Sequence, residues 1–278
     1  MSPWLETAGV ILVTGMGVTL GQRSQRLRAP LWAIGYLLSL SLIAILAVGR
    51  YDQMLQFTPP FSWIVAGRLR LAASALAISL GASTVLPRLP RVWEKITVSL
   101  VMVSLTLWSA VLPALAPALL QNHLAHLKTT LDTNGICLQT TQYTCGPAAA
   151  VTALRKLGLP AGEGELAILS HAGPTTGTLP ALLCKALRDR YTEEGLKCEY
   201  RPFESVTQLN GPGITLAIVR EAFLLDHCVA VLGVSNDMVT IADPGIGIRL
   251  MSRAQFETIW RFRGILLQRD PSAVPHQT

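Results

Sequence analysis

The chain has 278 residues, of which 50% are hydrophobic and only 14% are charged, and its mean hydropathy is +0.42. Soluble proteins carry charge on roughly a quarter of their residues, so this composition excludes a protein that is soluble throughout. The formal net charge is +6, but no basic face interleaved with aromatic residues is present, which argues against a nucleic-acid partner. The sequence contains no G-x-x-x-x-G-K-[ST] phosphate loop, so no ATP-driven motor lies on this chain.

Apolar residues are concentrated in the first 120 positions, where four stretches predict membrane-spanning helices. A helix needs about 20 predominantly apolar residues to cross the hydrocarbon core of a bilayer. The stretches lie near residues 4–21, 31–48, 65–86 and 96–120. We therefore predict an all-helical transmembrane region over residues 1–120 with about four spans in the lipid bilayer, and three spans as the alternative. Arg68 and Arg70 either extend to the membrane surface or line a polar pathway within the bundle.

Basic residues between the apolar stretches indicate the orientation of the chain. The loops after the first and third stretches carry Arg23, Arg26, Arg28, Arg88, Arg91 and Lys95. Because cytoplasmic loops are enriched in Lys and Arg, we expect these loops in the cytoplasm and the termini on the extracytoplasmic side. Arg50, Arg68 and Arg70 lie on the opposite side and weaken this assignment. The pattern predicts a multi-pass protein of the cell membrane.

Residues 121–133 are predicted to form the end of an interfacial helix and a linker. They contain His123 and His126 in an H-x-x-H spacing, but no acidic or cysteine partner nearby completes a metal site. Zinc needs three or four protein ligands, so we predict neither a metal nor another cofactor.

From residue 134 to residue 270 the density of charge becomes ordinary, which predicts one soluble domain, followed by a tail over residues 271–278. Helical periodicity and β-branched runs bounded by turn residues indicate its elements. Helices are predicted over residues 145–157, 164–172 and 179–190, and strands over residues 214–219, 227–234, 238–242 and 263–268. Helices followed by strands favour an α+β fold with segregated layers.

Cys145 lies in the stretch QTTQYTCGPAAAV, between a turn-like segment and a run of small residues. Thr144 is a suitable N-cap, which places the cysteine in the first turn of a helix, where Pro147 is tolerated. The positive end of the helix dipole stabilises a thiolate, which is the reactive form of cysteine. We expect Gly146 and the alanines that follow to leave the sulfur uncrowded. The pattern indicates a nucleophile.

His227 and Asp243 are candidates for the base and for the group that orients it. They lie at the outer ends of two predicted strands that a short turn connects, and an antiparallel hairpin would bring those ends together. By strand alternation His227 shares a face with Val229, whereas Cys228 points to the other face. We therefore expect the imidazole to face the helix that carries Cys145, and Cys228 to pack in the core.

Gln139 is a candidate donor to the oxyanion that forms during acyl transfer. It lies six residues before Cys145, so its amide can fold back toward the start of the helix, where the backbone N–H of the cysteine also points. Gln142 competes for the same role. A lone buried cysteine is usually a core residue. The signal for an active site is therefore the combination of Gln, Cys, His and Asp in this order, and not the cysteine alone.

The stretches QTTQYTCGPAAAVTALRKLG, HCVAVLGV and VTIADPG resemble the peptidase C39 family, papain-like cysteine peptidases related to the bacteriocin-processing domains of bacterial peptide exporters. The resemblance covers roughly residues 134–270 and implies a papain-like fold. It implies that Cys145 is the nucleophile, His227 the general base and acid, Asp243 the orienting group and Gln139 the oxyanion donor. Family members usually cut leader peptides after a Gly-Gly or Gly-Ala pair.

The sequence departs from the exporters in two respects. The apolar region precedes the peptidase-like part and no ATPase follows it, and Thr144 stands where family members often carry Asp. Both departures bear on which substrate is cut more than on the chemistry of the cleavage. We predict a membrane-anchored cysteine peptidase that cleaves a peptide or protein precursor after small residues, with a separate ABC-type exporter as a candidate partner. A non-catalytic peptide-binding module that assists a transporter is the alternative.

Two further features allow more than one interpretation. All five cysteines fall in the soluble domain, and an odd number leaves at least one thiol free. Cys137 and Cys145 could form a redox or structural pair, although their spacing is not C-x-x-C. Residues 173–178, GPTTGT, either connect two helices or border the substrate cleft.

Overall fold

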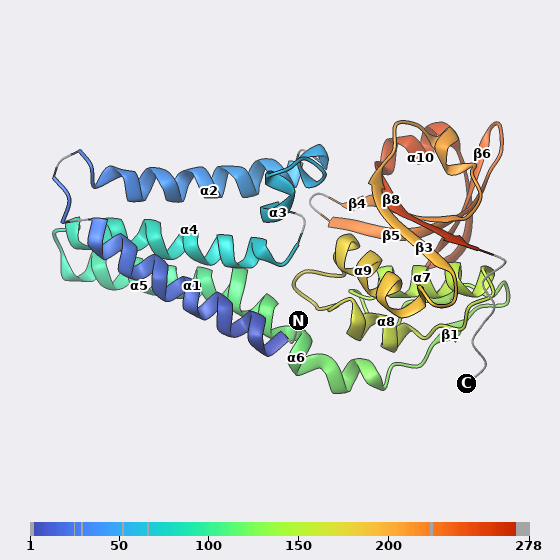
Figure 1. Cartoon of the computed structure of the whole chain (residues 1–278), viewed down its shortest axis with the longest axis horizontal. Coiled ribbons are helices and arrows are strands. Elements are labelled where there is room, and N and C mark those ends of the chain that lie inside the picture. The colour runs from blue at the N-terminus through green and yellow to red at the C-terminus, as the bar shows by residue number, and fades with distance from the viewer. Residues whose placement is uncertain are drawn as a thin grey trace. The chain divides into compact units, whose positions relative to one another are not determined.

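The computed structural model describes residues 3–24, 26–28, 30–51, 53–65, 67–222 and 225–270 (Figure 1). The chain divides into a helical unit, Met1–Leu119, and a mixed unit of helices and strands, Leu120–Thr278. Each unit is described by itself. The predicted tail over residues 271–278 lies outside the described residues.

The helical unit consists of apolar helices joined by short connections. They are α1 (Pro3–Ser24), α2 (Ala33–Tyr51), α3 (Phe61–Val65), α4 (Leu69–Val85), α5 (Val92–Thr106) and α6 (Leu112–Ala125), with a π-helical turn at Leu107–Val111 and 3₁₀ turns at Gln53–Gln56 and Leu86–Arg88. Three stretches, Pro3–Ser24, Leu69–Arg88 and Val92–Ala125, are long and apolar enough to cross a membrane, and Ala33–Gly49 is a shorter apolar helix. The prediction of an all-helical region with about four apolar helices is confirmed.

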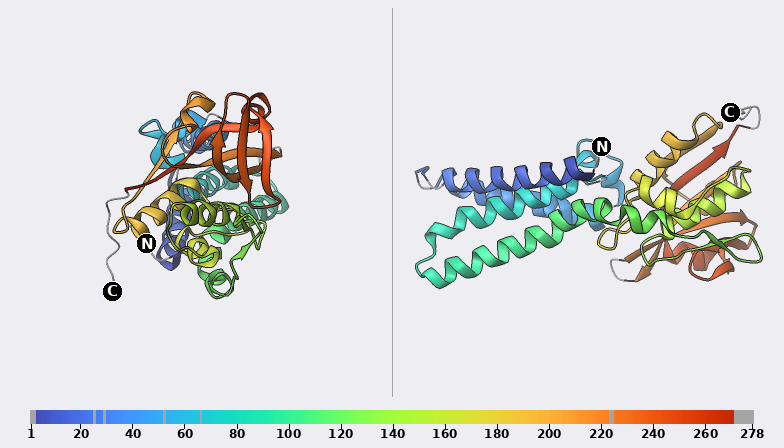
Figure 2. Two further views of the ribbon diagram at one scale, coloured as in Figure 1. Left: turned by 90° about the vertical axis from the view of Figure 1, so that its right-hand side faces the viewer. Right: turned by 90° about the horizontal axis from the view of Figure 1, so that it is seen from below.

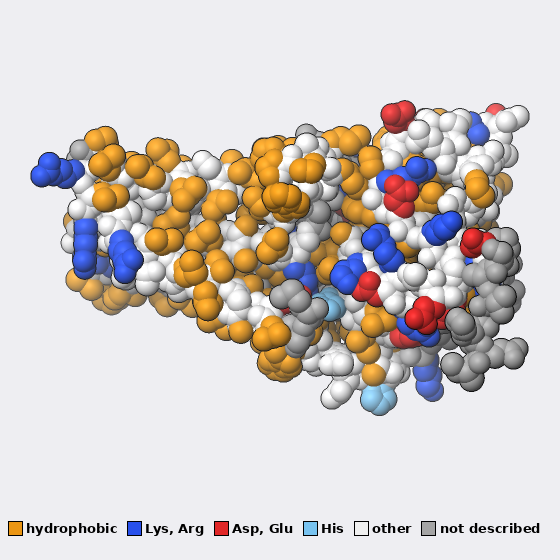
Figure 3. All heavy atoms as spheres, in the orientation of Figure 1, with side chains coloured by type: hydrophobic (Ala, Val, Ile, Leu, Met, Phe, Trp, Pro, Cys, Tyr) orange, Lys and Arg blue, Asp and Glu red, His pale blue; other side chains and the backbone are white. Residues whose placement is uncertain are grey.

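Large apolar side chains cover the outside of the helical unit, as the orange spheres in Figure 3 show. Leu12, Leu37, Leu100 and Trp108 are each more than half exposed. A surface of this kind is unfavourable in water and is typical of proteins that face lipid.

Small residues bring α1 and α4 close together. A Cβ atom added at Gly21 of α1 would lie 2.7 Å from Cβ of Ser83 in α4, and one at Gly17 would collide with Ser79. Without a hydrophobic driving force between helices, packing in a membrane relies on such small residues, which allow the backbones to approach.

Arg68, immediately before α4, is buried in the helical unit. It pairs with Glu6 of α1, and its side chain is 9% exposed. Its Nη2 donates to the carbonyl of Ala114 at 2.9 Å and to that of Pro113 at 3.4 Å. Pro117 has no N–H for the Pro113 carbonyl four residues earlier, so the arginine supplies the missing donor. The side chain of Arg68 is thus held between helices of the unit.

The two basic connections of the helical unit lie against each other. The guanidinium of Arg88, between α4 and α5, stacks over the ring of Trp32, just before α2, at 3.6 Å from the ring centroid. Blue side chains gather at this end of the unit in Figure 3.

The mixed unit contains one antiparallel sheet of six strands in the order β3-β8-β4-β5-β6-β7. Its strands are β3 (Leu196–Pro202), β4 (Ile214–Ala222), β5 (Leu225–Val234), β6 (Met238–Asp243), β7 (Gly247–Ser252) and β8 (Trp260–Arg269), and β1 (Thr130–Leu131) pairs with β2 (Cys137–Leu138) separately. The helices are α7 (Cys145–Lys156), α8 (Glu163–Leu169), α9 (Pro180–Tyr191) and α10 (Arg253–Ile259), and Val206–Leu209 forms a 3₁₀ turn.

Two apolar clusters lie on opposite faces of this sheet. One joins α7 and α9 to the face of β4 and β5 that carries Leu216 and Ala230. The other joins Phe256 of α10 to the face that carries Val229 and Val231. Helices α7, α8 and α9 thus cover one face and α10 covers the other (Figures 1 and 2).

The α+β class that the sequence predicts for this unit is confirmed. The three predicted helices and four predicted strands are present with ends shifted by a few residues, whereas β3, β7 and α10 were not predicted. Residues 121–133, expected as a linker, are largely built into the mixed unit. Leu124 of α6 is buried against Ala167 and Ala172, and Thr129 Oγ1 accepts from the backbone N–H of Glu163 at 2.9 Å.

Candidate active site

Cys145 is the first residue of α7 and is partly exposed. Thr144 holds the N-cap position, and its carbonyl accepts the first helical hydrogen bond, from Ala148 N at 2.9 Å. The sequence predicted that its hydroxyl caps the helix, but the hydroxyl makes no such bond. It instead accepts from the backbone N–H of Thr141 at 3.1 Å and donates to the carbonyl of Thr141 at 3.0 Å. The first N–H groups of α7 therefore have no side-chain cap and lie beside the sulfur.

The small residues after Cys145 serve packing more than access. Ala148, Ala149 and Ala150 are fully buried in the cluster between α7 and the sheet, so their size allows the helix to approach the strands. A Cβ added at Gly146 would lie 3.2 Å from side-chain atoms of Leu183 and of Thr178. The expectation that this run keeps the sulfur uncrowded is corrected, because these residues face the core.

The predicted hairpin is present and joins His227 to Asp243. Strands β5 and β6 pair antiparallel, with Ala230 opposite Ala242. Beyond this pair, Nε2 of His227 and Oδ1 of Asp243 are 2.8 Å apart. The side chain of Cys145 is close enough to the ring to raise the pKa of His227, and Nδ1 of the ring lies 4.0 Å from Oε2 of Glu221. The structure thus brings these three predicted residues together.

The predicted face of β5 is wrong, although the contact is present. Helix α7 covers the face that carries Cys228 and Ala230, whereas Val229 and Val231 pack on the other side of the sheet. His227 lies outside the part of β5 that pairs with β6, which begins at Ala230, and it pairs with Val219 of β4.

The charges around His227 favour its protonated form. Burial lowers the pKa of the ring, but hydrogen bonds with Asp243 and Cys145, and the charges of both, outweigh it and raise the pKa of His227 to about 10. Burial likewise opposes the charge on Asp243, but bonds from His227 and from the Gly245 N–H, at 2.9 Å, lower the pKa of Asp243. Arg249 adds a contact of 3.4 Å to the second oxygen. The histidine and aspartate thus form a hydrogen-bonded ion pair.

Other cysteines of the mixed unit differ from Cys145. Cys137 and Cys228 are buried, and burial raises the pKa of Cys137 to about 12 and the pKa of Cys228 above its usual value. Both thiols therefore stay protonated near neutral pH. The thiol of Cys137 is near its own segment, 3.9 Å from the carbonyl of Leu138, and is not in a disulfide, so a pair with Cys145 is not formed.

Gln139 lies beside the turn that follows Asp243. Its backbone N–H donates to the carbonyl of Pro244 at 2.9 Å. Its side-chain Oε1 is buried and has no hydrogen-bond partner in the part of the chain that the structure describes. Since buried polar atoms are normally paired, this amide is a group that the fold itself does not use. Gln142, its competitor, is exposed.

Glu163 is a residue of the site that the sequence did not reveal. It is fully buried at the start of α8, where its carboxylate accepts from the Thr140 N–H at 2.8 Å and from the Thr140 hydroxyl at 2.6 Å. It therefore fixes the residue next to Gln139. No local signal in the sequence marks it, because a glutamate at a helix start is common on surfaces as well.

Replacing Glu163 with alanine is expected to lower the free energy of unfolding of the mixed unit by about 2 kcal/mol, since the N–H and the hydroxyl of Thr140 lose a charged acceptor. Urea titration followed by limited proteolysis measures this loss. Glu165→Ala is the matched control, because this neighbouring carboxylate is 45% exposed in its ion pair with Arg190 and such pairs contribute about 1 kcal/mol or less. Equal losses in the two variants would contradict the assignment.

The loop GPTTGT ends against the start of α7. Thr178 Oγ1 donates to the carbonyl of Tyr143 at 3.1 Å, and the same side chain lies against Gly146. The loop connects α8 to α9, as the first interpretation expects, and its end also lies beside the start of α7. Among the described residues, no group of three or more His, Cys, Asp or Glu side chains is placed to hold a metal ion.

Comparison with known proteins gives relatives of the mixed unit. An uncharacterized protein of Methanothermobacter marburgensis is 30% identical over 144 residues, which are 52% of this chain and 95% of the relative. Another, from Methanothermobacter thermautotrophicus, is 27% identical over 143 residues, 51% of this chain and 94% of the relative.

Solved structures similar to the mixed unit include two peptidase domains. The peptidase domain of Streptococcus ComA, a bi-functional ABC transporter involved in a quorum sensing pathway, is 21% identical with a TM-score of 0.42 and covers 48% of this chain and 96% of its own. A double glycine motif protease from an AMS/PCAT transporter, solved with its leader peptide, is 14% identical with a TM-score of 0.42 and covers 52% of this chain and 96% of its own.

The sequence profile described as the peptidase C39 family matches residues 133–273, half of the chain. These residues contain Gln139, Cys145, His227 and Asp243. The chain belongs to the peptidase C39 family.

Proposed function

We propose that the mixed unit is a cysteine endopeptidase with Cys145 as its nucleophile. The observation that carries this proposal is the hydrogen bond between His227 and Asp243, at 2.8 Å, beside the side chain of Cys145, which raises the pKa of the ring. A cysteine at a helix start, a histidine within hydrogen-bond reach and a carboxylate that orients the ring are the parts that covalent acyl transfer requires. A core residue or a structural histidine needs no such arrangement.

The proposed reaction has two halves, in which a thioester with Cys145 is first formed and then hydrolysed. The Cys145 thiolate attacks the substrate carbonyl, and the negative oxygen is stabilised by the backbone N–H of Cys145 and the amide of Gln139. The His227 imidazolium then donates its proton to the leaving amine, so the peptide bond breaks and a thioester remains. In the second half the imidazole takes a proton from water while the resulting hydroxide attacks the thioester, and the C–S bond then breaks, which releases the acid product and restores the Cys145 thiolate and the protonated His227.

We propose that the substrate is a peptide or protein precursor cut after small residues, such as a Gly-Gly leader. Membership in the C39 family supports this substrate class. The peptidase domains named above belong to transporters, and one was solved with a leader peptide. A separate exporter remains the partner that we propose on the basis of the family resemblance.

We further propose that the helical unit anchors the peptidase in a membrane, with four passes and the mixed unit on the extracytoplasmic side. Three helices are long and apolar enough to span a bilayer. The two basic connections meet at one end of the unit, where Arg88 stacks on Trp32. Loops rich in Lys and Arg stay in the cytoplasm, which supports this orientation.

Labelling with iodoacetamide near neutral pH tests the catalytic proposal in the full-length protein. We expect Cys145 to react faster than the four buried cysteines, because it is partly exposed and lies beside a protonated imidazole. His227→Ala should slow the labelling of Cys145, and mass spectrometry of proteolytic peptides measures both rates. A Cys145 that reacts no faster in the folded chain than in the urea-unfolded chain would instead support a non-catalytic peptide-binding module.

A further inference from the structure

Cys184 of α9 and Cys198 of β3 lie side by side in the core of the mixed unit. Their sulfur atoms are 2.8 Å apart, closer than nonbonded sulfur atoms normally pack. The side chains are buried, with exposed fractions of 2% and 8%. We propose that Cys184 and Cys198 are joined by a disulfide in the mature protein.

The geometry needs little adjustment to form the bond. A disulfide has an S–S distance near 2.05 Å, so the two sulfurs must approach by about 0.8 Å. The chain connects α9 to β3 through a tight turn at Thr192–Gly195, where Gly195 has a φ of 79°. Because helix and strand follow each other closely, the backbone already holds both cysteines in position.

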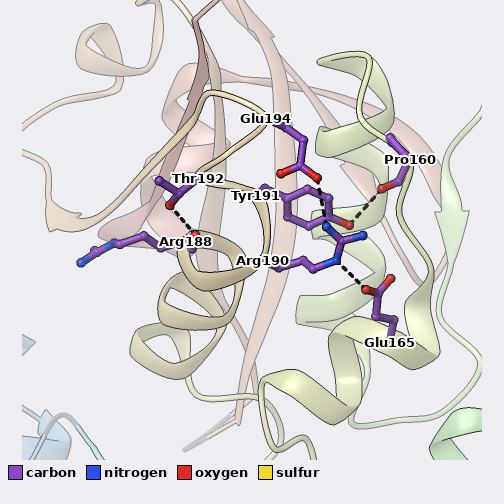
Figure 4. A network of polar contacts seen from close by, with 7 residues as sticks. All are labelled: Pro160, Glu165, Arg188, Arg190, Tyr191, Thr192 and Glu194. Carbon is purple, nitrogen blue, oxygen red and sulfur yellow. Dashed lines mark hydrogen bonds and ion pairs between the residues drawn. The ribbon is translucent and has the colours of Figure 1, made fainter. Parts of the chain in front are cut away.

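A polar network fixes the end of α9 next to this turn (Figure 4). Nε of Arg190 donates to Glu165 of α8 at 2.8 Å, and its Nη1 donates to Glu194 of the turn at 3.0 Å. The hydroxyl of Tyr191, which is fully buried, donates to the carbonyl of Pro160 at 2.9 Å. These contacts hold α9 against α8 and against the turn that leads into β3.

Arg188 links both cysteines and favours their oxidation. Its Nη2 lies 3.8 Å from Sγ of Cys184 and donates to the carbonyl of Cys198 at 3.2 Å. The hydrogen bond from Cys198, together with Arg188, outweighs burial and lowers the pKa of Cys184 to about 7, while the pKa of Cys198 is raised. Cys184 is thus the thiol that becomes the thiolate, the species that attacks a disulfide.

The oxidant is a protein disulfide of the thiol–disulfide oxidoreductase class. The Cys184 thiolate attacks one sulfur of that disulfide, forms a mixed disulfide and releases one thiolate of the oxidant. Cys198 then loses its proton and attacks Sγ of Cys184, which releases the second thiol. The two cysteines lose two electrons and two protons, and the oxidant gains them. Because both thiols are buried in the packed unit, the exchange requires a local opening around α9 and β3, in which Arg188 can stay beside Cys184 because both lie on α9, one helical turn apart.

The pairing leaves the proposed nucleophile free. All five cysteines are free thiols in this structure, and the proposed link would leave Cys137, Cys145 and Cys228 unpaired, in agreement with the odd number of cysteines. The bond also stiffens the neighbourhood of the site, because Leu183, next to Cys184 in α9, lies against Gly146. Disulfides persist mainly outside the cytosol, so the link fits the orientation proposed for the mixed unit. The presence of the disulfide can be tested without any assay of peptide cleavage.

The experiment traps the thiol state of the full-length chain in the cell. Cells that express the protein are quenched with acid, the chain is denatured with N-ethylmaleimide, and proteolytic peptides are analysed by mass spectrometry with and without a reductant. We expect the peptides of Cys184 and Cys198 to be linked and unlabelled until reduction, and Cys137, Cys145 and Cys228 to be labelled at once. N-Ethylmaleimide on both Cys184 and Cys198 in the unreduced sample would overturn the proposal.

Two variants make the result specific. Cys184→Ala should leave Cys198 open to labelling, whereas Cys228→Ala, which removes another buried cysteine of the same core, should leave the link intact. A link that persists in Cys184→Ala would show another partner and overturn the pairing. In the wild-type protein, reduction should lower the midpoint temperature of unfolding of the mixed unit by about 10 °C, because the closed loop is short but constrains the unfolded chain.

Discussion

Replacing Cys145 with alanine is expected to abolish cleavage of a peptide that contains a Gly-Gly leader, with a loss of at least about 10⁴-fold in rate. Without the sulfur no thioester forms, and the remaining groups can only bind the substrate or polarise its carbonyl. The measurement is liquid chromatography and mass spectrometry of the products, with the full-length protein held in a lipid bilayer. Turnover at the wild-type rate in this variant would refute the assignment of the nucleophile.

The control for this variant is Cys137→Ala. Cys137 is fully buried, and its thiol is near the carbonyl of its own neighbour Leu138. This variant removes a thiol from the same unit but leaves Cys145, His227 and Asp243 in place, so cleavage should persist. Thermal unfolding of both variants shows whether a loss of rate reflects chemistry or a loss of fold.

Replacing His227 with alanine is expected to lower the rate of cleavage by about 10²- to 10⁴-fold, because proton transfer to the leaving amine is lost. In the wild-type protein the hydrogen bonds and charges of Asp243 and Cys145 raise the pKa of His227 to about 10. The proposed reaction begins with a protonated ring, and a raised pKa keeps the ring protonated below that value. The wild-type rate should therefore fall as the pH rises through about 10.

The residual rate of His227→Ala should lack this alkaline decrease, because the group that titrates is gone. His126→Ala is the matched control, since this exposed histidine of the mixed unit bonds only to the carbonyl of Asn122, at 2.6 Å in the preceding helical turn. It should keep both the rate and the pH profile of the wild-type protein. A decrease near pH 10 that persists in His227→Ala would assign the titration to another group.

The parts of the site that the sequence predicted are those that local patterns determine. The hairpin of β5 and β6 follows from two β-branched runs and a short polar turn, and it places His227 and Asp243 at the same end. Alternation assigns residues to two faces but does not say which face a distant helix covers. The error on the face of His227 arose from this missing information, because the packing of α7 on β5 is a long-range contact.

The elements that the sequence did not reveal depend on partners far along the chain. Strand β3 contains four polar or charged residues in LKCEYRP and pairs only with β8, more than 60 residues later. Helix α10 has seven residues, too few for a clear helical period. Glu163 is similar, because its role comes from Thr140 across the fold and not from its neighbours in the sequence.

The order of strands in the sheet has a consequence for the newly made protein. Strand β4, the partner of His227 in β5, is paired on its other side with β8, the last strand of the described chain. A central strand cannot be completed until both neighbours are present, and such long-range pairing forms late in folding. Cys145 leaves the ribosome more than 100 residues before β8 ends. On the proposed mechanism, the thiol of the emerging chain is therefore inactive, and the proposed peptidase activity is delayed until synthesis of the unit is complete.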